Sequence, residues 1–241
     1  MHFYKIVLSY DGLGFNGFQK QPNKDTVQGR IEQSLSLLTN QYLFTYAGRT
    51  DTGVHARNQV LCLETDQLFD EKLVYSFNQM LGNKILVKSF KKIPKKFDAR
   101  FDAVQRTYKY FLANQLTLDP YKQSFIKESK VDVNLTILNK VAKLFLGTHD
   151  FSSFAKLEDG QNPTRNITHS SWLKRSDIFE YTISGNSFLR NMVRNIVGAQ
   201  IALLEEKLTI KDITKKIINP DGVRLNYIAP AKALVLWKVK Y

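Results

Sequence analysis

The segment AGRTDTGVHA, residues 47–56, holds the side chains best suited to chemistry. Asp51 can act as a nucleophile or a base, and Gly48 and Gly53 let the backbone turn tightly and approach a ligand. Arg49 lies two residues before Asp51, so in an extended loop both side chains point the same way. Such a cation would keep the carboxylate ionised and would also bind phosphate. A purely structural Asx turn, with Asp51 capping the loop, explains the same residues.

The triplet Asp51-Thr52-Gly53 is also the catalytic triplet of aspartic proteases. Those enzymes need two such carboxylates that share one proton. This chain has a single copy, so a second copy would have to come from a dimer partner. Protease triplets also follow an apolar strand, whereas this one follows Gly48-Arg49-Thr50. The protease interpretation is therefore the weaker one.

A second motif, G-x-G-x-x-G at residues 12–17, follows a predicted strand and raises the question of a dinucleotide site. In such sites the third glycine lies in the opening turn of a helix whose N-terminus holds the pyrophosphate. Here the chain continues FQKQP, which is poor helix-opening sequence, and Glu32 falls inside a predicted helix. The four histidines show no metal-ligand spacing and there is no Walker loop, so we expect neither cofactor nor metal.

Charge points to a phosphate-rich partner. The chain has 241 residues and carries a formal net charge of +13, which suits binding to nucleic acid. A lysine-rich composition without such a partner is the alternative. No stretch approaches the roughly 20 apolar residues of a membrane span, and the N-terminus lacks the apolar segment of a signal peptide. We therefore expect a cytoplasmic protein. Cys62, the only cysteine, excludes an intrachain disulfide and fits a buried thiol.

The chemical residues must be positioned by alternating strands and helices. In the first hundred residues we predict strands at 5–10, 42–47, 59–65 and 85–93, and helices from near Asp25 and around 71–81. In the second half we predict strands at 106–113, 179–185 and 233–241. The helices there begin after Asn134, include the apolar face from Phe188 to Val197, and cover 209–218. Five lysines around Pro94 predict a basic connector, so we place one α+β domain at 1–97 and another at 98–241.

The loop at 47–60 closely resembles the signature of the TruA family of tRNA pseudouridine synthases. Further segments resemble the family's motifs in the same order and cover nearly the whole chain: YDGLGFNGFQ, TVQGRIEQSL, FDARFDAVQRTYKY, GTHDFSSF, GNSFLRNMVRNIVG and APAKALVLWKVKY. The resemblance implies an α+β protein of two ferredoxin-like domains whose antiparallel sheets join around a central basic cleft. It also implies a homodimer that binds tRNA and isomerises uridine to pseudouridine without a cofactor.

The resemblance further implies a role for individual residues. Asp51 would be the catalyst, and Arg49 would help to displace the target nucleotide. Tyr108 would stack on the uracil, Arg194 would pair with the catalytic carboxylate, and Leu234 would line the base pocket. The family norm places the modified uridines at positions 38, 39 and 40 of the anticodon stem-loop. Without the family, Tyr108 is an ordinary half-buried strand residue and Arg194 a solvated helix residue.

Three departures from the family pattern put pocket detail in doubt, but not the reaction. An aromatic ring is kept at Phe18, where the family has tryptophan. Asp98 and Asp102 add two carboxylates near the domain junction, and Ala233 stands where glycine is usual.

The rival function is a non-catalytic RNA-binding module or tRNA chaperone, which would use the same basic surface.

Overall fold

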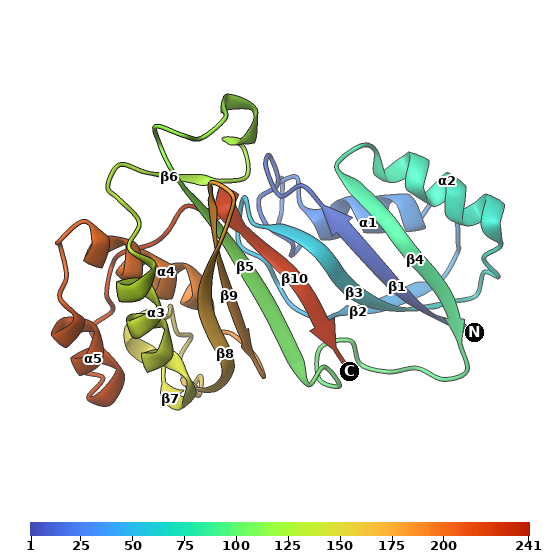
Figure 1. The fold of residues 1–241 in the computed structure, drawn as a ribbon. Coiled ribbons are helices and arrows are strands. Elements are labelled where there is room, and N and C mark those ends of the chain that lie inside the picture. The colour runs from blue at the N-terminus through green and yellow to red at the C-terminus, as the bar shows by residue number, and fades with distance from the viewer. The chain divides into compact units, whose positions relative to one another are not determined.

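The computed structural model describes all residues, 1–241, and divides them into two compact units. Unit 1 comprises Met1–Val104 together with Val235–Tyr241, and unit 2 comprises Gln105–Leu234. Strands and helices are mixed in both, and most strand pairs are antiparallel, so the predicted α+β class is confirmed (Figure 1). The units begin and end at different residues from the predicted domains 1–97 and 98–241, and the assignment of domains stays a prediction.

Unit 1 is built on a sheet in the order β4-β1-β3-β10, with β2 also paired to β3. Every pair is antiparallel except β3 with β10, which is parallel. Its strands are β1 (His2–Tyr10), β2 (Tyr42–Tyr46), β3 (His55–Thr65), β4 (Ile85–Ile93) and β10 (Leu234–Lys240), of which the first residue belongs to unit 2. Its helices, α1 (Val27–Leu35) and α2 (Glu71–Leu81), lie next to each other (Figure 1). Their apolar faces are buried, with Ile31 and Phe77 fully enclosed.

Unit 2 has strands in the order β5-β9-β8-β7, with the short β6 parallel to β5. These strands are β5 (Gln105–Asn114), β6 (Lys127–Ser129), β7 (Gly147–Asp150), β8 (Thr164–Arg175) and β9 (Ile178–Gly185). The helices α3 (Leu135–Ala142), α4 (Met192–Leu204) and α5 (Ile210–Ile218) gather on one side of these strands (Figure 1). Four single-turn 3₁₀ helices complete it: η1 (Pro120–Lys122), η2 (Lys143–Phe145), η3 (Ser152–Phe154) and η4 (Ala231–Ala233).

The predicted strands and helices are all present, but some boundaries differ. Helix α1 is capped by Thr26, whose hydroxyl accepts from the Gly29 N–H at 3.2 Å. Asp25, where the helix was predicted to begin, instead forms a two-point ion pair with Arg30. Phe188 lies before α4, which begins at Met192. The twelve-residue strand β8 was not predicted, because its polar run THSS masks the alternation of buried positions.

Most of the lysine cluster near Pro94, which the sequence predicted as a basic connector, lies on a strand. Lys88, Lys91 and Lys92 belong to β4, which lies at the edge of the sheet and pairs with β1. Charged side chains on an edge strand discourage pairing with other chains. Lys96, beyond the strand, forms an ion pair with Glu64 at 2.7 Å. The basic stretch is therefore mostly part of the fold rather than a linker.

Candidate active site

Asp51 lies at the first position of a β-turn that precedes β3. The Val54 N–H donates to the Asp51 carbonyl at 3.0 Å, closing the turn. Gly53 occupies the third position with φ of +77°, where a side chain would be strained. The Asp51 side chain is half-buried. The glycine after the carboxylate therefore has a backbone role, as the sequence predicted.

Three contacts fix the chain just before Asp51. The fully buried Gln59 donates through Nε2 to the Gly48 carbonyl at 2.7 Å. The hydroxyls of Tyr10 and Thr50 are 2.9 Å apart, and the Phe18 N–H donates to the Thr50 carbonyl at 3.1 Å. Gly48 and Thr50, which flank Arg49 just before Asp51, are thus held by residues of β1, of β3 and of the chain that follows the glycines at 12–17. Such multiple anchoring is what a positioned catalytic group requires.

The glycine segment, residues 12–17, packs closely against the Asp51 turn and the residue before it. A Cβ on Gly12 would lie 2.1 Å from the Val54 carbonyl oxygen, and one on Gly17 would lie 2.9 Å from that of Thr50. Gly17 also has φ of +88°. Only glycine allows the two backbones to approach this closely. The G-x-G-x-x-G motif therefore allows this segment to pack against the loop that carries Asp51.

The first N–H groups of α1, which a dinucleotide site would use, are already occupied. The Val27 N–H donates to the Gly17 carbonyl at 3.2 Å, and that of Gln28 to the Phe18 carbonyl at 2.8 Å. Thr26 accepts from the next one, as described above. A pyrophosphate at a helix N-terminus needs these donors. The structure thus gives a physical reason why the G-x-G-x-x-G spacing is not a nucleotide site.

Arg49 precedes the first residue of the Asp51 turn by two positions. Its side chain is exposed. An exposed guanidinium beside a carboxylate-bearing turn can bind an anionic group such as a phosphate.

In unit 2, Tyr108 lies on β5 and Arg194 on α4. Tyr108 is nearly buried and packs edge-on against Phe188, with ring centroids 5.2 Å apart. Tyr110, two residues on, shares this face, since alternate residues of a strand point the same way. Burial raises the pKa of Tyr110 far above its ordinary value, while the nearby Arg194 charge acts in the opposite direction. Tyr110 thus shares a strand face with Tyr108, and its pKa is affected by the charge of Arg194.

Arg194 is held by the segment that runs past α4. Its Nε donates to the Ala229 carbonyl at 2.8 Å, and its own carbonyl accepts from the Ala229 N–H at 3.0 Å. A Cβ on Gly198, one helical turn later, would lie 1.9 Å from the Tyr227 carbonyl oxygen. Gly198 thus allows the segment 227–229 to lie directly on the helix, and this contact orients the arginine.

The departures from the family pattern have local explanations. Asp98 accepts from the N–H groups of Arg100 and Phe101 at 2.7 and 2.8 Å, and Asp102 accepts from that of Asp98 at 2.9 Å. These carboxylates therefore close a surface turn. Ala233 is fully buried at the end of η4 with no positive φ, so alanine is tolerated there, and Leu234 after it is buried too.

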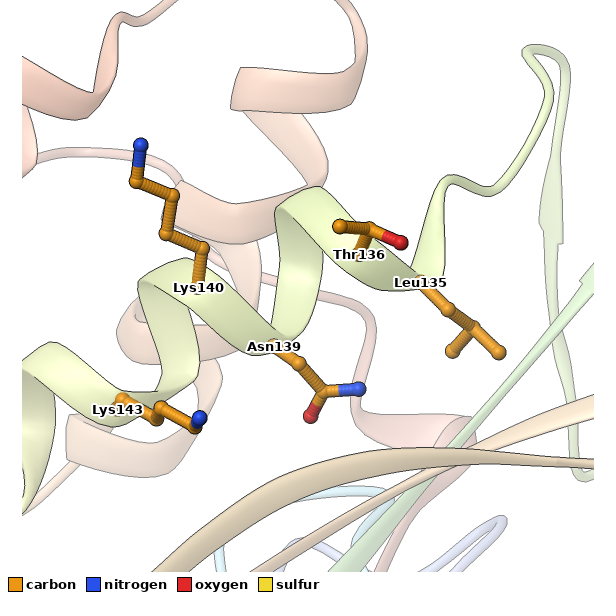
Figure 2. A pocket seen from close by; sticks show the side chains of 5 residues that line it. All are labelled: Leu135, Thr136, Asn139, Lys140 and Lys143. Atoms are coloured by element: carbon orange, nitrogen blue, oxygen red, sulfur yellow. The ribbon is translucent and has the colours of Figure 1, made fainter.

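A surface hollow of about 450 Å³ lies along α3 and contains none of the predicted site residues (Figure 2). Figure 2 shows the side chains of Lys140 and Lys143 around it, with Asn139 turned toward the neighbouring strand. The Asn139 amide is used at both ends, since it donates to the Trp172 carbonyl and accepts from its N–H. The hollow therefore lacks the convergent polar groups of a binding site.

The predicted site residues fall into two groups. Arg49 and Asp51 belong to unit 1, and Tyr108, Arg194 and Leu234 belong to unit 2. Sequence reasoning missed several supporting residues, among them Tyr10, His55, Gln59 and Gly198. Of these, His55 and Gln59 lie close to Asp51 in sequence, which is the only signal that could have found them. No group of three or more His, Cys, Asp or Glu side chains is arranged to hold a metal ion.

Comparison with known proteins places these features in one class. Residues 141–241 match the family model described as tRNA pseudouridine synthase. The tRNA pseudouridine synthase A of Dictyoglomus thermophilum is 35% identical over 99% of both chains. Those of Bacillus subtilis (34%, 98% of both chains) and Borrelia turicatae (36%, 97% of both chains) are similar. A Cbf5-Nop10-Gar1 complex aligns at 11% identity over 82% of this chain and 44% of that chain, with a TM-score of 0.37, too low to bear on the fold.

The α+β fold and the carboxylate turn thus belong to a pseudouridine synthase. More specifically, the chain belongs to the TruA family, the tRNA pseudouridine synthases A, because it matches its relatives over nearly their full length. None of its helices has the length and apolar character that a membrane span requires.

Proposed function

We propose that this chain converts uridine to pseudouridine in tRNA with Asp51 as the catalytic nucleophile. Membership of the family supports the reaction and its substrate. The observation that carries the residue assignment is the turn at Asp51, which is closed by Val54 and packed on the glycine segment, while Gln59 and Tyr10 hold the residues just before it. A residue that only capped a surface loop would not need this support.

The reaction suits a positioned carboxylate. The bond from uracil N1 to ribose C1′ breaks, the base turns, and its C5 bonds to C1′. The C5 proton is released and N1 gains a proton, so the product is an isomer of the substrate. A carboxylate can attack or stabilise an electron-poor sugar carbon, as in glycoside hydrolysis. Attack on the uracil ring and proton removal are the other roles open to Asp51.

The target uridine must leave its stack, which costs on the order of a few kcal/mol. In our proposal Tyr108 stacks on the extruded base, which contributes about 1–3 kcal/mol, and Leu234 lines the pocket. Arg49 occupies the space left in the RNA, and its exposure is consistent with this role. Arg194 pairs with Asp51, by resemblance to the family, and its orientation by Ala229 supports a positioned guanidinium.

The wider arrangement is also proposed from the family. It comprises two ferredoxin-like domains around a basic cleft, at residues 1–97 and 98–241, in a cytoplasmic homodimer. The expected targets are positions 38, 39 and 40 of the anticodon stem-loop. The net charge of +13 supports a phosphate-binding cleft. Light scattering on the purified protein tests the dimer, and a monomer at the working concentration would contradict it.

The test compares the wild-type chain with Asp51→Asn on a tRNA transcript that carries uridines at 38, 39 and 40. Carbodiimide labelling followed by primer extension maps the pseudouridines, and filter retention measures binding. We expect stops at one or more of these positions with wild type and none with Asp51→Asn, at similar affinity. Asp159→Asn, the same change at an exposed carboxylate, should behave as wild type.

Two other outcomes would each reject part of the proposal. Full turnover by Asp51→Asn would reject Asp51 as nucleophile, and products only outside the anticodon stem-loop would reject the target site. Tight tRNA binding by wild type without any product would favour the non-catalytic RNA-binding module instead.

A further inference from the structure

His55 lies at the start of β3, four residues after Asp51, and is 4% exposed. Its Nδ1 is 3.1 Å from the Gly12 N–H nitrogen and 3.1 Å from Oδ1 of Asp11. Gly12 is also buried, so its N–H depends on this ring nitrogen for a hydrogen bond. The histidine therefore faces the glycine segment, which the proposed mechanism uses only as a support.

The chemistry of the ring restricts what Nδ1 can do. Without a proton, Nδ1 accepts from the Gly12 N–H, and the ring proton is then on Nε2. With a proton, Nδ1 would donate to Asp11 and leave the buried Gly12 N–H unsatisfied, at a cost. Asp11 Oδ1 already accepts from the Leu13 N–H at 2.9 Å. The arrangement favours the first state, in which the histidine holds the backbone of Gly12.

Holding Gly12 also holds the Asp51 turn. The Cα of Gly12 packs against the Val54 carbonyl so closely that a Cβ there would lie 2.1 Å from its oxygen. The N–H of Val54 closes the turn on Asp51. The imidazole thus contacts Gly12, Gly12 contacts Val54, and Val54 contacts Asp51. All these residues belong to unit 1.

We propose that His55 is a positioning residue for Asp51, acting through the Gly12 N–H; this rests on the proposed role of Asp51. A displacement of about 1 Å in a catalytic group can cost on the order of 100-fold in rate. Loss of the Nδ1 acceptor therefore lowers kcat. It leaves KM and tRNA affinity unchanged, because His55 is buried beneath the turn and is not presented to the RNA.

Two variants separate the acceptor from the bulk of the ring. His55→Phe keeps a ring and removes the acceptor, whereas His55→Asn places an amide oxygen about where Nδ1 was. We expect kcat to fall roughly 10- to 100-fold in His55→Phe, with KM changed less than about twofold. His55→Asn should recover most of that loss. His169→Phe, at an exposed position, is the matched control.

Equal losses in the two variants, or wild-type kcat in His55→Phe, would overturn the proposal. A wild-type chain that forms no pseudouridine would instead reject the proposed function, so the two failures are distinguishable. Should His55→Phe not fold, the wild-type protein still gives a test. Long-range ¹H–¹⁵N correlation spectra should show His55 protonated on Nε2 only, and a proton on Nδ1 would overturn the proposal.

Discussion

At the scale of single residues, the site depends on positions that have no side chain at all. Gly17 has φ of +88°, and its Cα faces the Thr50 carbonyl. Gly17→Ala would incur both a strained backbone, costing about 1–2 kcal/mol, and a displacement of the chain next to Asp51. We expect a larger fall in the free energy of unfolding than backbone strain alone gives, together with a fall in kcat.

Gly160→Ala is the matched control for this prediction. Gly160 also has a positive φ, +71°, but nothing lies within 4 Å of its ideal Cβ. For Gly160→Ala the free energy of unfolding should fall only by the cost of backbone strain, and kcat should be unchanged. Urea unfolding and turnover measured on both variants provide the comparison, and equal effects at the two glycines would contradict the close packing of the two loops.

At the scale of elements, the position of Arg194 depends on how the segment 227–229 lies on α4. Replacing a helical glycine by alanine normally stabilises a helix by about 1 kcal/mol. At Gly198 we expect the opposite sign, because the new methyl would meet the Tyr227 carbonyl. Thermal unfolding of Gly198→Ala should show a lower Tm, and kcat should fall as Ala229 moves away from Arg194. A raised Tm would contradict the packing described.

Most elements were predictable because their patterns are local. The helix predicted around 71–81 and the strand predicted at 85–93 match α2 and β4. Local pattern fails where distant contacts decide the structure. Strand β8 is stabilised by pairing with β7 and β9, which its polar sequence does not reveal.

The same limit applies to the site. Asp51 stood out because glycines and an arginine surround it in sequence. Gly12 and Gly198 did not reveal their roles, since the carbonyls that require them belong to residues far along the chain, at 54 and 227. The G-x-G-x-x-G spacing suggested a nucleotide site because the sequence does not show that the backbone at residues 50 and 54 packs against these glycines. The spacing of glycines indicates positions where no side chain fits, but it does not indicate which group packs against them.

At the scale of the whole molecule, charge governs the encounter with tRNA. The chain carries 35 Lys and Arg against 22 Asp and Glu. If binding neutralises 6–10 phosphates, affinity should fall by roughly 10³–10⁵-fold between 50 and 200 mM salt. Filter retention over a salt series measures the slope. A flat response would contradict a binding surface that contacts mainly phosphates.

The central claim is that Asp51 performs the chemical step rather than binding. Forming the C5 to C1′ bond displaces the hydrogen on uracil C5, so tritium at C5 is released to water once per pseudouridine. The most direct measurement is therefore single-turnover tritium release from labelled tRNA, with enzyme in excess and saturating. We predict release by wild type and no detectable release by Asp51→Asn, although the variant binds all the tRNA. Release at the wild-type rate by Asp51→Asn would contradict the claim.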